Sequence, residues 1–259
     1  GSRLRQPVMN SSAQDDREDS DSLKDSPAPY DVVVFDCDST LADLEGIDWL
    51  AADLSIQELT DIESMTHAAM GGGLRLEEVY GARLELIAPC AGAMAGLGAE
   101  YIARLLPGAR LLFDVLFFLS KEVHVVSGGL YPGVLALALD LGVPKENVHA
   151  VAISFDHGGS YSGFDTDSPL ARKGGKIEVI AELAAGRRVV LIGDGLTDLE
   201  ASPVCSRFIA FGGVVRRDAV FERAKVHTEE RDLVSLIPLL LSASERRKLA
   251  ATERFTDLF

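Results

Sequence analysis

The sequence predicts an α/β fold, in which a doubly wound, Rossmann-like parallel sheet carries a helical cap inserted after its first strand. From about residue 122 onward, short apolar runs alternate with segments of helical periodicity. Such alternation is typical of a parallel sheet that is covered by helices on both faces. Before that point, no strand pattern occurs between Asp43 and Leu119. An all-helical block in this position would lie over the carboxyl edge of the sheet, where open α/β sheets bind ligands.

The first strand is expected at residues 32–35, because Val-Val-Val-Phe is a continuous apolar run typical of a strand buried on both faces. Apolar residues then recur at three- and four-residue spacing over 45–70 and 75–88, and more weakly over 92–106. The glycines at 71–73 separate the first two of these predicted helices.

The second half of the chain supplies the rest of the predicted sheet. Strands are expected at 122–126, 148–155, 188–192, 207–211 and 225–227, with a short β excursion at 160–164. Helices are expected from about residue 131, over 176–185, near residue 216 and from about residue 231.

These elements imply three parts. Residues 1–29 are rich in Ser and Asp and poor in apolar side chains, so we expect a disordered acidic tail. Residues 30–44 and 110–259 form the predicted α/β core, and residues 45–109 form the predicted helical cap.

Composition restricts the classes of partner. The net charge of −15 argues against nucleic acid and against an anionic membrane, since both bind basic surfaces. No apolar stretch is long enough to predict a transmembrane helix. The three cysteines fit neither a disulfide framework nor a zinc site and favour the cytoplasm, although Arg3 and Arg5 leave a trimmed organellar targeting segment open. A homodimer is also left open.

Polar residues that suit phosphoryl transfer lie at predicted strand ends or in adjoining loops. Each feature alone has an ordinary structural explanation, as a turn, a helix cap or a solvated surface residue. Their common place at one edge of the sheet favours a shared site. The residues are Asp36, Asp38 and Thr40 after the first strand, Ser127 and Gly128 after the second, Lys176 at a helix start, and Asp194 and Asp198 after a later strand.

Phosphoryl transfer needs a nucleophile, cations that neutralise the transferring oxygens, and hydrogen-bond donors around them. Asp36 is the candidate nucleophile, and Asp38 the candidate general acid and base. Asp36 and Asp194 are carboxylates of the kind that bind Mg²⁺. Ser127, Gly128 and Lys176 would bind phosphate oxygens.

The same segments resemble four motifs of the haloacid dehalogenase superfamily and, within it, of the phosphoserine phosphatases. The resemblance covers about residues 30 to 240. It implies that Asp38 gives its backbone carbonyl to the metal and that Thr40 and Asp198 support the site. The matching segments are Asp36-Cys37-Asp38-Ser39-Thr40, Val125-Val126-Ser127-Gly128-Gly129, Gly174-Gly175-Lys176 and Gly193-Asp194-Gly195-Leu196-Thr197-Asp198.

The resemblance extends into the predicted cap. It implies that Glu45 contacts a substrate ammonium group and that Arg83 holds a substrate carboxylate, which together would recognise a free amino acid. It also implies that Met70 and Gly71 line the site, and that Thr197 contacts substrate. Judged from spacing alone, Glu45 suits a helix N-terminus and Arg83 suits a surface ion pair.

The expected function is Mg²⁺-dependent hydrolysis of O-phospho-L-serine to L-serine and phosphate, the last step of serine biosynthesis, through an aspartyl-phosphate. Three alternatives remain: transfer of the phosphoryl group to another alcohol such as homoserine, hydrolysis of another small phosphomonoester, and a catalytically dead homologue that only binds. A binding module has no need of a nucleophile and a proton shuttle together, which disfavours the last.

Overall fold

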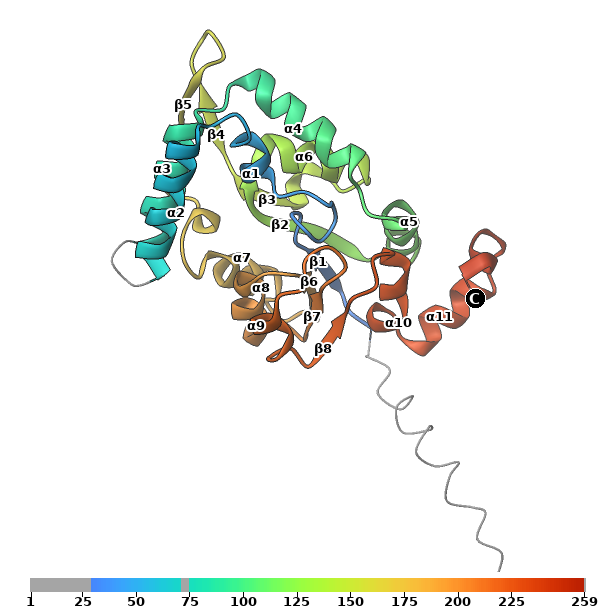
Figure 1. Ribbon diagram of the computed structural model, residues 1–259. Helices are drawn as coiled ribbons and strands as arrows, with labels where there is room; N and C mark the ends of the chain where they lie inside the picture. Colours follow the sequence, from blue (N-terminus) through green and yellow to red (C-terminus); the bar gives the residue numbers. More distant parts are fainter. Residues whose placement is uncertain (1–28, 71–74, 259) are drawn as a thin grey trace, which may run out of the picture.

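The computed structural model describes residues 29–70 and 75–258, and its centre is a six-stranded parallel sheet. The strand order is β3–β2–β1–β6–β7–β8, so the first strand lies in the middle (Figure 1). This arrangement confirms the predicted doubly wound α/β fold. The strands are β1 (Val32–Phe35), β2 (Glu122–Leu130), β3 (Val148–Val151), β6 (Val189–Gly193), β7 (Arg207–Phe211) and β8 (Val226–Thr228).

Two separate apolar clusters form the core, one on each face of the sheet. Val33 and Phe35 of β1 belong to one cluster, whereas Val32 and Val34 belong to the other. Successive side chains of a strand point to opposite faces, so an uninterrupted apolar run is what a sheet covered on both sides requires. The first cluster includes residues of α5 (Ala109–Phe118) and α6 (Tyr131–Asp140), and the second includes residues of α7 (Gly175–Leu183) and α8 (Leu196–Ala201).

The segment between β1 and α5 is helical throughout its regular elements, as predicted. We call residues 46–103 the insert. Its last helix packs against α6 of the core, where a Cβ on Gly98 would lie 2.7 Å from that of Ala136. The helices of the insert are α1 (Gly46–Leu50), α2 (Ile56–Met70), α3 (Leu76–Ile87) and α4 (Ala91–Ala103). The periodic pattern over 45–70 is therefore two helices, separated by a turn.

The predicted strand at 148–155 is wrong as a single element. The chain leaves the sheet at Ala152, and β4 (Ile153–Phe155) pairs antiparallel with β5 (Tyr161–Phe164) in a separate two-stranded sheet. No Gly or Pro marks the break, and residues 148–155 are uniformly compatible with a strand, so the sequence does not indicate where the strand ends. The hairpin reaches α3, where the rings of Tyr80 and Phe164 have centroids 5.4 Å apart.

The end of the chain completes the cover of the sheet with α9 (Asp218–Phe221), α10 (Ile237–Leu240) and α11 (Ala243–Ala250). Within the described residues, no single helix is long and apolar enough to cross a membrane. Glu77–Ile87 and Ala91–Ala103 pass that test only as a pair, and they are bent by 107° relative to each other. The predicted acidic tail lies almost wholly outside the described residues.

Candidate active site

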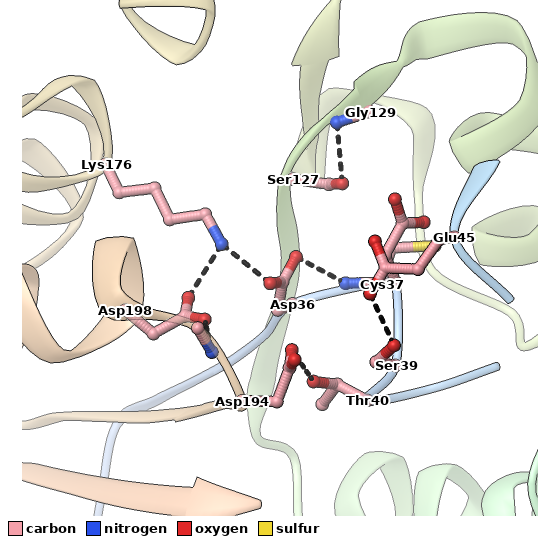
Figure 2. Close-up of polar contacts among 12 residues, drawn as sticks. Asp36, Cys37, Ser39, Thr40, Glu45, Ser127, Gly129, Lys176, Asp194 and Asp198 are labelled. Atoms are coloured by element: carbon pink, nitrogen blue, oxygen red, sulfur yellow. Dashed lines mark hydrogen bonds and ion pairs between the residues drawn. The ribbon is translucent and has the colours of Figure 1, made fainter. Parts of the chain in front are cut away.

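The register of the sheet brings three of the predicted motifs to one edge. Phe35, the last residue of β1, lies beside Val125 of β2 and Ile192 of β6. The residues that follow these positions are therefore neighbours, and they include Asp36 and Asp194. Figure 2 shows these two side chains with Ser127, Lys176 and Asp198 around a common centre.

Asp36 is held on both carboxylate oxygens. Oδ1 accepts the backbone N–H of Cys37 at 2.7 Å, and Oδ2 lies 2.8 Å from the Nζ of Lys176. The same ammonium lies 2.7 Å from Oδ1 of Asp198, so Lys176 bridges two carboxylates (Figure 2). Burial alone would lower the pKa of Lys176, but the two carboxylates outweigh it and raise that pKa. Lys176 is thus a permanent cation in the site.

Asp194 faces Asp36 from the end of β6. Its Oδ1 accepts the hydroxyl of Thr40 at 3.2 Å, and its Oδ2 lies 3.0 Å from the Nε of Arg217. Burial, followed by the nearby charge of Asp36, raises the pKa of Asp194 to about 6. A divalent cation between these carboxylates would offset both effects.

The aspartates are close enough to share a metal ion. Ligand atoms of Asp36, Asp194 and Asp198 all lie within 4.8 Å of one another, and the three residues are buried. Asp198 also accepts hydrogen bonds from Lys176 and from the N–H of Gly195, at 2.7 and 3.0 Å, and these bonds orient it within the site. A set of carboxylate oxygens fits a hard cation.

Asp38 lies next to the insert and is half-buried. Its Oδ1 accepts the hydroxyl of Tyr101, and its Oδ2 lies 3.4 Å from the N–H of Gly46. Burial raises the pKa of Asp38 to about 7, with smaller contributions from the charges of Asp36 and Glu45, while the Tyr101 hydroxyl acts in the opposite direction. A carboxyl group with this pKa can both give and take a proton near neutral pH.

Cys37, between the two aspartates, is fully buried, and burial raises the pKa of its thiol well above the ordinary value. A neutral thiol is a poor nucleophile. Cys37 is therefore unsuited to act as the nucleophile.

Glu45 lies at the mouth of the site, just before α1. Its Oε1 accepts the Ser39 hydroxyl at 2.6 Å and lies 3.3 Å from an Nη of Arg217. Ser39 adopts a left-handed backbone with φ of 52°, which turns the chain sharply after Asp38. Arg217 therefore bridges Glu45 to Asp194.

A cavity of about 360 Å³ opens onto these groups. Gly128, from the loop-like end of β2, lines it, and the carbonyl of Gly128 accepts the Tyr80 hydroxyl at 2.9 Å. The N–H of Gly129 donates to the Ser127 hydroxyl oxygen at 3.0 Å, which leaves the Ser127 proton available for a ligand. The predicted site residues that line the cavity are Asp36, Asp38, Glu45, Ser127, Gly128, Lys176, Asp194 and Thr197.

Arg83 does not line this cavity. It forms an ion pair with Asp48 at 2.6 Å in a second cavity of about 410 Å³, which is lined by residues of α1, α2 and α3. Its Nε is buried and has no hydrogen-bond partner among the described residues. The side chain of Met70 and all of Gly71 lie outside the described residues.

Two contributors were missed by the sequence reasoning. Arg217 lies 23 residues after Asp194 in the sequence, and the two side chains meet only in the folded structure. The Arg216-Arg217 pair belongs to no motif that would indicate this contact. Tyr101 lies in α4, 63 residues from the Asp38 that it contacts. Its place on an apolar helix face predicts only a core residue.

Comparison with known proteins agrees with this geometry. A family model described as haloacid dehalogenase-like hydrolase matches residues 33–202. The chain belongs to the haloacid dehalogenase-like hydrolases. The resemblance predicted from the four motifs is thereby confirmed.

Within this family, the chain groups with phosphatases. It is 39% identical to the phosphoserine phosphatase of Rattus norvegicus over 198 residues, which are 75% of this chain and 87% of the rat protein. It is 35% identical over 199 residues to a chloroplastic phosphoserine phosphatase of Arabidopsis thaliana, which covers 75% of this chain and 67% of that protein. The chain is therefore a haloacid dehalogenase-type phosphatase.

A solved structure shares the architecture. A phosphoserine phosphohydrolase-like protein from Francisella tularensis superimposes with a TM-score of 0.69 at 25% sequence identity. The match covers 81% of this chain and 99% of that one. This likeness supports the α/β fold.

Proposed function

We propose that this protein hydrolyses O-phospho-L-serine to L-serine and phosphate, with Mg²⁺ as its metal ion. The observation that carries the proposal is the shared cavity of Asp36, Asp38 and Lys176. A buried nucleophile, a carboxyl group with a pKa of about 7 and a permanent cation meet there. The relatives named phosphoserine phosphatase supply the choice of substrate.

In the first step, a carboxylate oxygen of Asp36 attacks the phosphorus atom, and the bond between phosphorus and the serine oxygen breaks. The protonated carboxyl of Asp38 gives its proton to the departing oxygen, so that serine leaves as a neutral alcohol. Lys176 lies 2.8 Å from Asp36 and would counter charge on the phosphoryl oxygens during the transfer. The product on the enzyme is an aspartyl-phosphate.

In the second step, water attacks the phosphorus of the aspartyl-phosphate. Asp38, now a carboxylate, takes a proton from that water, and the bond between phosphorus and Asp36 breaks. Phosphate leaves, and both aspartates return to their starting forms. One residue acts in turn as acid and base, which suits a pKa near neutrality.

The metal ion would be held by the carboxylates of Asp36 and Asp194 and by the backbone carbonyl of Asp38. When bound, Mg²⁺ supplies positive charge to the transferring phosphoryl oxygens. Asp198 and Thr40 would support the site by orienting Lys176 and Asp194, which they contact at 2.7 and 3.2 Å.

The substrate would be recognised by its charges. Glu45 at the mouth of the cavity suits the ammonium group, and Ser127, Gly128 and Thr197 suit the phosphate. Arg83 is the proposed partner of the carboxylate, and its buried Nε, which has no acceptor among the described residues, supports a missing ligand. Reaching the substrate would require Arg83 to leave Asp48. Met70 and Gly71 are proposed to line the closed site.

Phosphate release from O-phospho-L-serine, measured with Mg²⁺ and with EDTA, tests the proposal. We expect turnover only with the metal, and Asp36→Asn is expected to reduce turnover to background. Turnover by that variant would contradict the mechanism. Analysis of products in the presence of homoserine separates hydrolysis from transfer, since transfer would yield phosphohomoserine instead of phosphate.

The part assigned to Arg83 has its own test. Arg83→Ala is expected to raise KM strongly for phosphoserine and to leave p-nitrophenyl phosphate almost unaffected, because the aryl ester has no carboxylate. Arg75→Ala is a matched control, since Arg75 is exposed and, among the described residues, forms its ion pair with the neighbouring Glu78. Equal effects of Arg83→Ala on both substrates would refute carboxylate recognition.

We also propose that residues 45–109 act as a cap over a core formed by residues 30–44 and 110–259. The packing of α3 on the β4–β5 hairpin and of α4 on α6 joins this cap to the core. The free cysteines support a reducing compartment such as the cytoplasm.

A further inference from the structure

A third cavity, which we call the basic cavity, lies at the end of the sheet opposite the aspartates. It has a volume of about 650 Å³ and surrounds the start of β7 and the start of β8. In Figure 1 these strands lie beside α8 and α9 in the orange part of the chain. The cavity is lined by Leu199, Ser202, Pro203, Cys205, Ser206, Arg207, Phe208, Arg223, Ala224, Lys225 and Val226.

The charges of this cavity are of one sign. Arg207, Arg223 and Lys225 contribute three positive charges, and none of the described residues that line it is acidic. The Cys205 thiol in the cavity wall adds no negative charge, because burial raises its pKa to about 12. The whole chain carries 40 acidic and 25 basic residues, so a cavity with three basic and no acidic lining residues differs from the average composition of the chain.

These cations are also without partners of their own. Within residues 29–70 and 75–258, neither an ion pair nor a side-chain hydrogen bond joins Arg207, Arg223 or Lys225 to a carboxylate. Other arginines are paired, for example Arg216 with Asp218 at 2.7 Å. Three like charges that line one cavity repel each other, and an anion bound in the cavity would relieve that repulsion.

The remaining wall suits a small ligand with a compact apolar part. Leu199 and Phe208 are buried apolar residues of the wall, and Ser202 and Ser206 line the same cavity as the cations. A volume of about 650 Å³ is within the usual range for small-molecule sites, which is roughly 300–1,000 Å³.

We propose that this basic cavity is a second anion site, which binds a small phosphorylated metabolite carrying at least two negative charges. It has no lining residue in common with the catalytic cavity, and it lies at the amino ends of β7 and β8, whereas the catalytic groups lie at the carboxyl ends of β1, β2 and β6 in the same parallel sheet. The proposal does not depend on the identity of the substrate.

The site also has a direct structural connection to the catalytic residues. Leu199, in the wall of the basic cavity, follows Asp198 in α8, and Asp198 bonds Lys176. A ligand that fixes α8 from one side therefore acts on the helix that carries part of the catalytic site.

Calorimetric titration of the full chain with inorganic pyrophosphate, in EDTA, tests the proposal. The informative variant is Arg223→Gln with Lys225→Gln, because both side chains are exposed and their loss leaves the core intact. The matched control is Lys145→Gln with Arg247→Gln, which removes two exposed cations elsewhere and changes the net charge equally. Thermal unfolding of each variant checks that the fold is retained.

We expect the parent and the control to bind pyrophosphate with similar Kd, and the cavity variant to bind at least about tenfold more weakly, since each lost charge-assisted contact contributes on the order of 1 kcal/mol or more. Binding that is equal in the two double variants would place pyrophosphate in the catalytic cavity and overturn the proposal. Absence of binding to the parent would overturn it as well.

Discussion

Replacing Tyr101 by Phe should move the pH dependence of the reaction without moving the catalytic groups. The Tyr101 hydroxyl donates to Oδ1 of Asp38, and it stabilises the charged carboxylate relative to the neutral acid. Burial raises the pKa of Tyr101 well above its ordinary value, so the phenol stays protonated and remains a donor through the assay range. The substitution removes this donor from a fully buried position.

The size of the effect follows from the hydrogen bond. A bond to a charged acceptor contributes roughly 1.5–3 kcal/mol, and one pKa unit corresponds to about 1.4 kcal/mol. The pKa of Asp38, about 7 in the parent, is therefore expected to rise by roughly one to two units in Tyr101→Phe. Because the protonated acid is needed for the first step, the alkaline limb of the kcat/KM profile should move to higher pH by the same amount.

The assay is the pH profile of kcat/KM from about pH 5 to pH 10 at saturating Mg²⁺. Any effect of the metal on Asp38 is common to both proteins and cancels in the difference. Tyr80→Phe is the matched control, since it removes a tyrosine hydroxyl that donates to the carbonyl of Gly128 rather than to Asp38. An alkaline limb that stays in place or moves to lower pH in Tyr101→Phe would refute the reasoning, as would an equal shift in the control.

Three further predictions concern the neighbours of that proton shuttle. Asp38→Asn should unfold at a higher temperature than the parent at pH 8 in EDTA. The raised pKa of Asp38 gives the folded parent stability that is present below the pKa of the unfolded state and is lost as the pH rises through about 7, so the parent alone loses up to about 4 kcal/mol. Melting curves of the two proteins that differ equally at pH 4 and pH 8 would contradict this. Arg217→Gln should lower the Mg²⁺ concentration for half-maximal activity by about fivefold, because it removes a cation that lies 3.0 Å from Asp194 and competes with the metal. An unchanged Mg²⁺ titration would exclude such competition. Gly46→Ala should lower the free energy of unfolding by about 1–3 kcal/mol in urea, since the added Cβ would overlap the Tyr101 hydroxyl oxygen. An unchanged urea midpoint would show that α1 can move away freely.

The order of strands and helices was predictable because the apolar runs alternate with helical periods and punctuation. The run at 32–35 has no polar residue, and it is buried on both faces as that pattern requires. The break at Ala152 was not predictable, because the residues on both sides favour a strand equally. Only the antiparallel pairing with 161–164, which lies across a turn, draws the chain out of the sheet.

The candidate site divides in the same way. Asp36 and Asp194 were predictable since each follows a strand, and Ser127 because it lies in the last part of β2, and parallel strands align their carboxyl ends at one edge. Arg217 and Tyr101 reach the site from a short loop and from the face of a helix. Nothing local distinguishes a catalytic neighbour from a surface arginine or a core tyrosine, because the contact depends on how distant elements pack.

The position of Tyr101 and Gly46 has a consequence for how such enzymes diversify. Both residues belong to the insert, whereas the Asp38 that they contact lies in the loop that follows β1. A chimera that received a different insert on the same sheet would therefore exchange the working pH of the enzyme, while Asp36 and Lys176 stayed as they were.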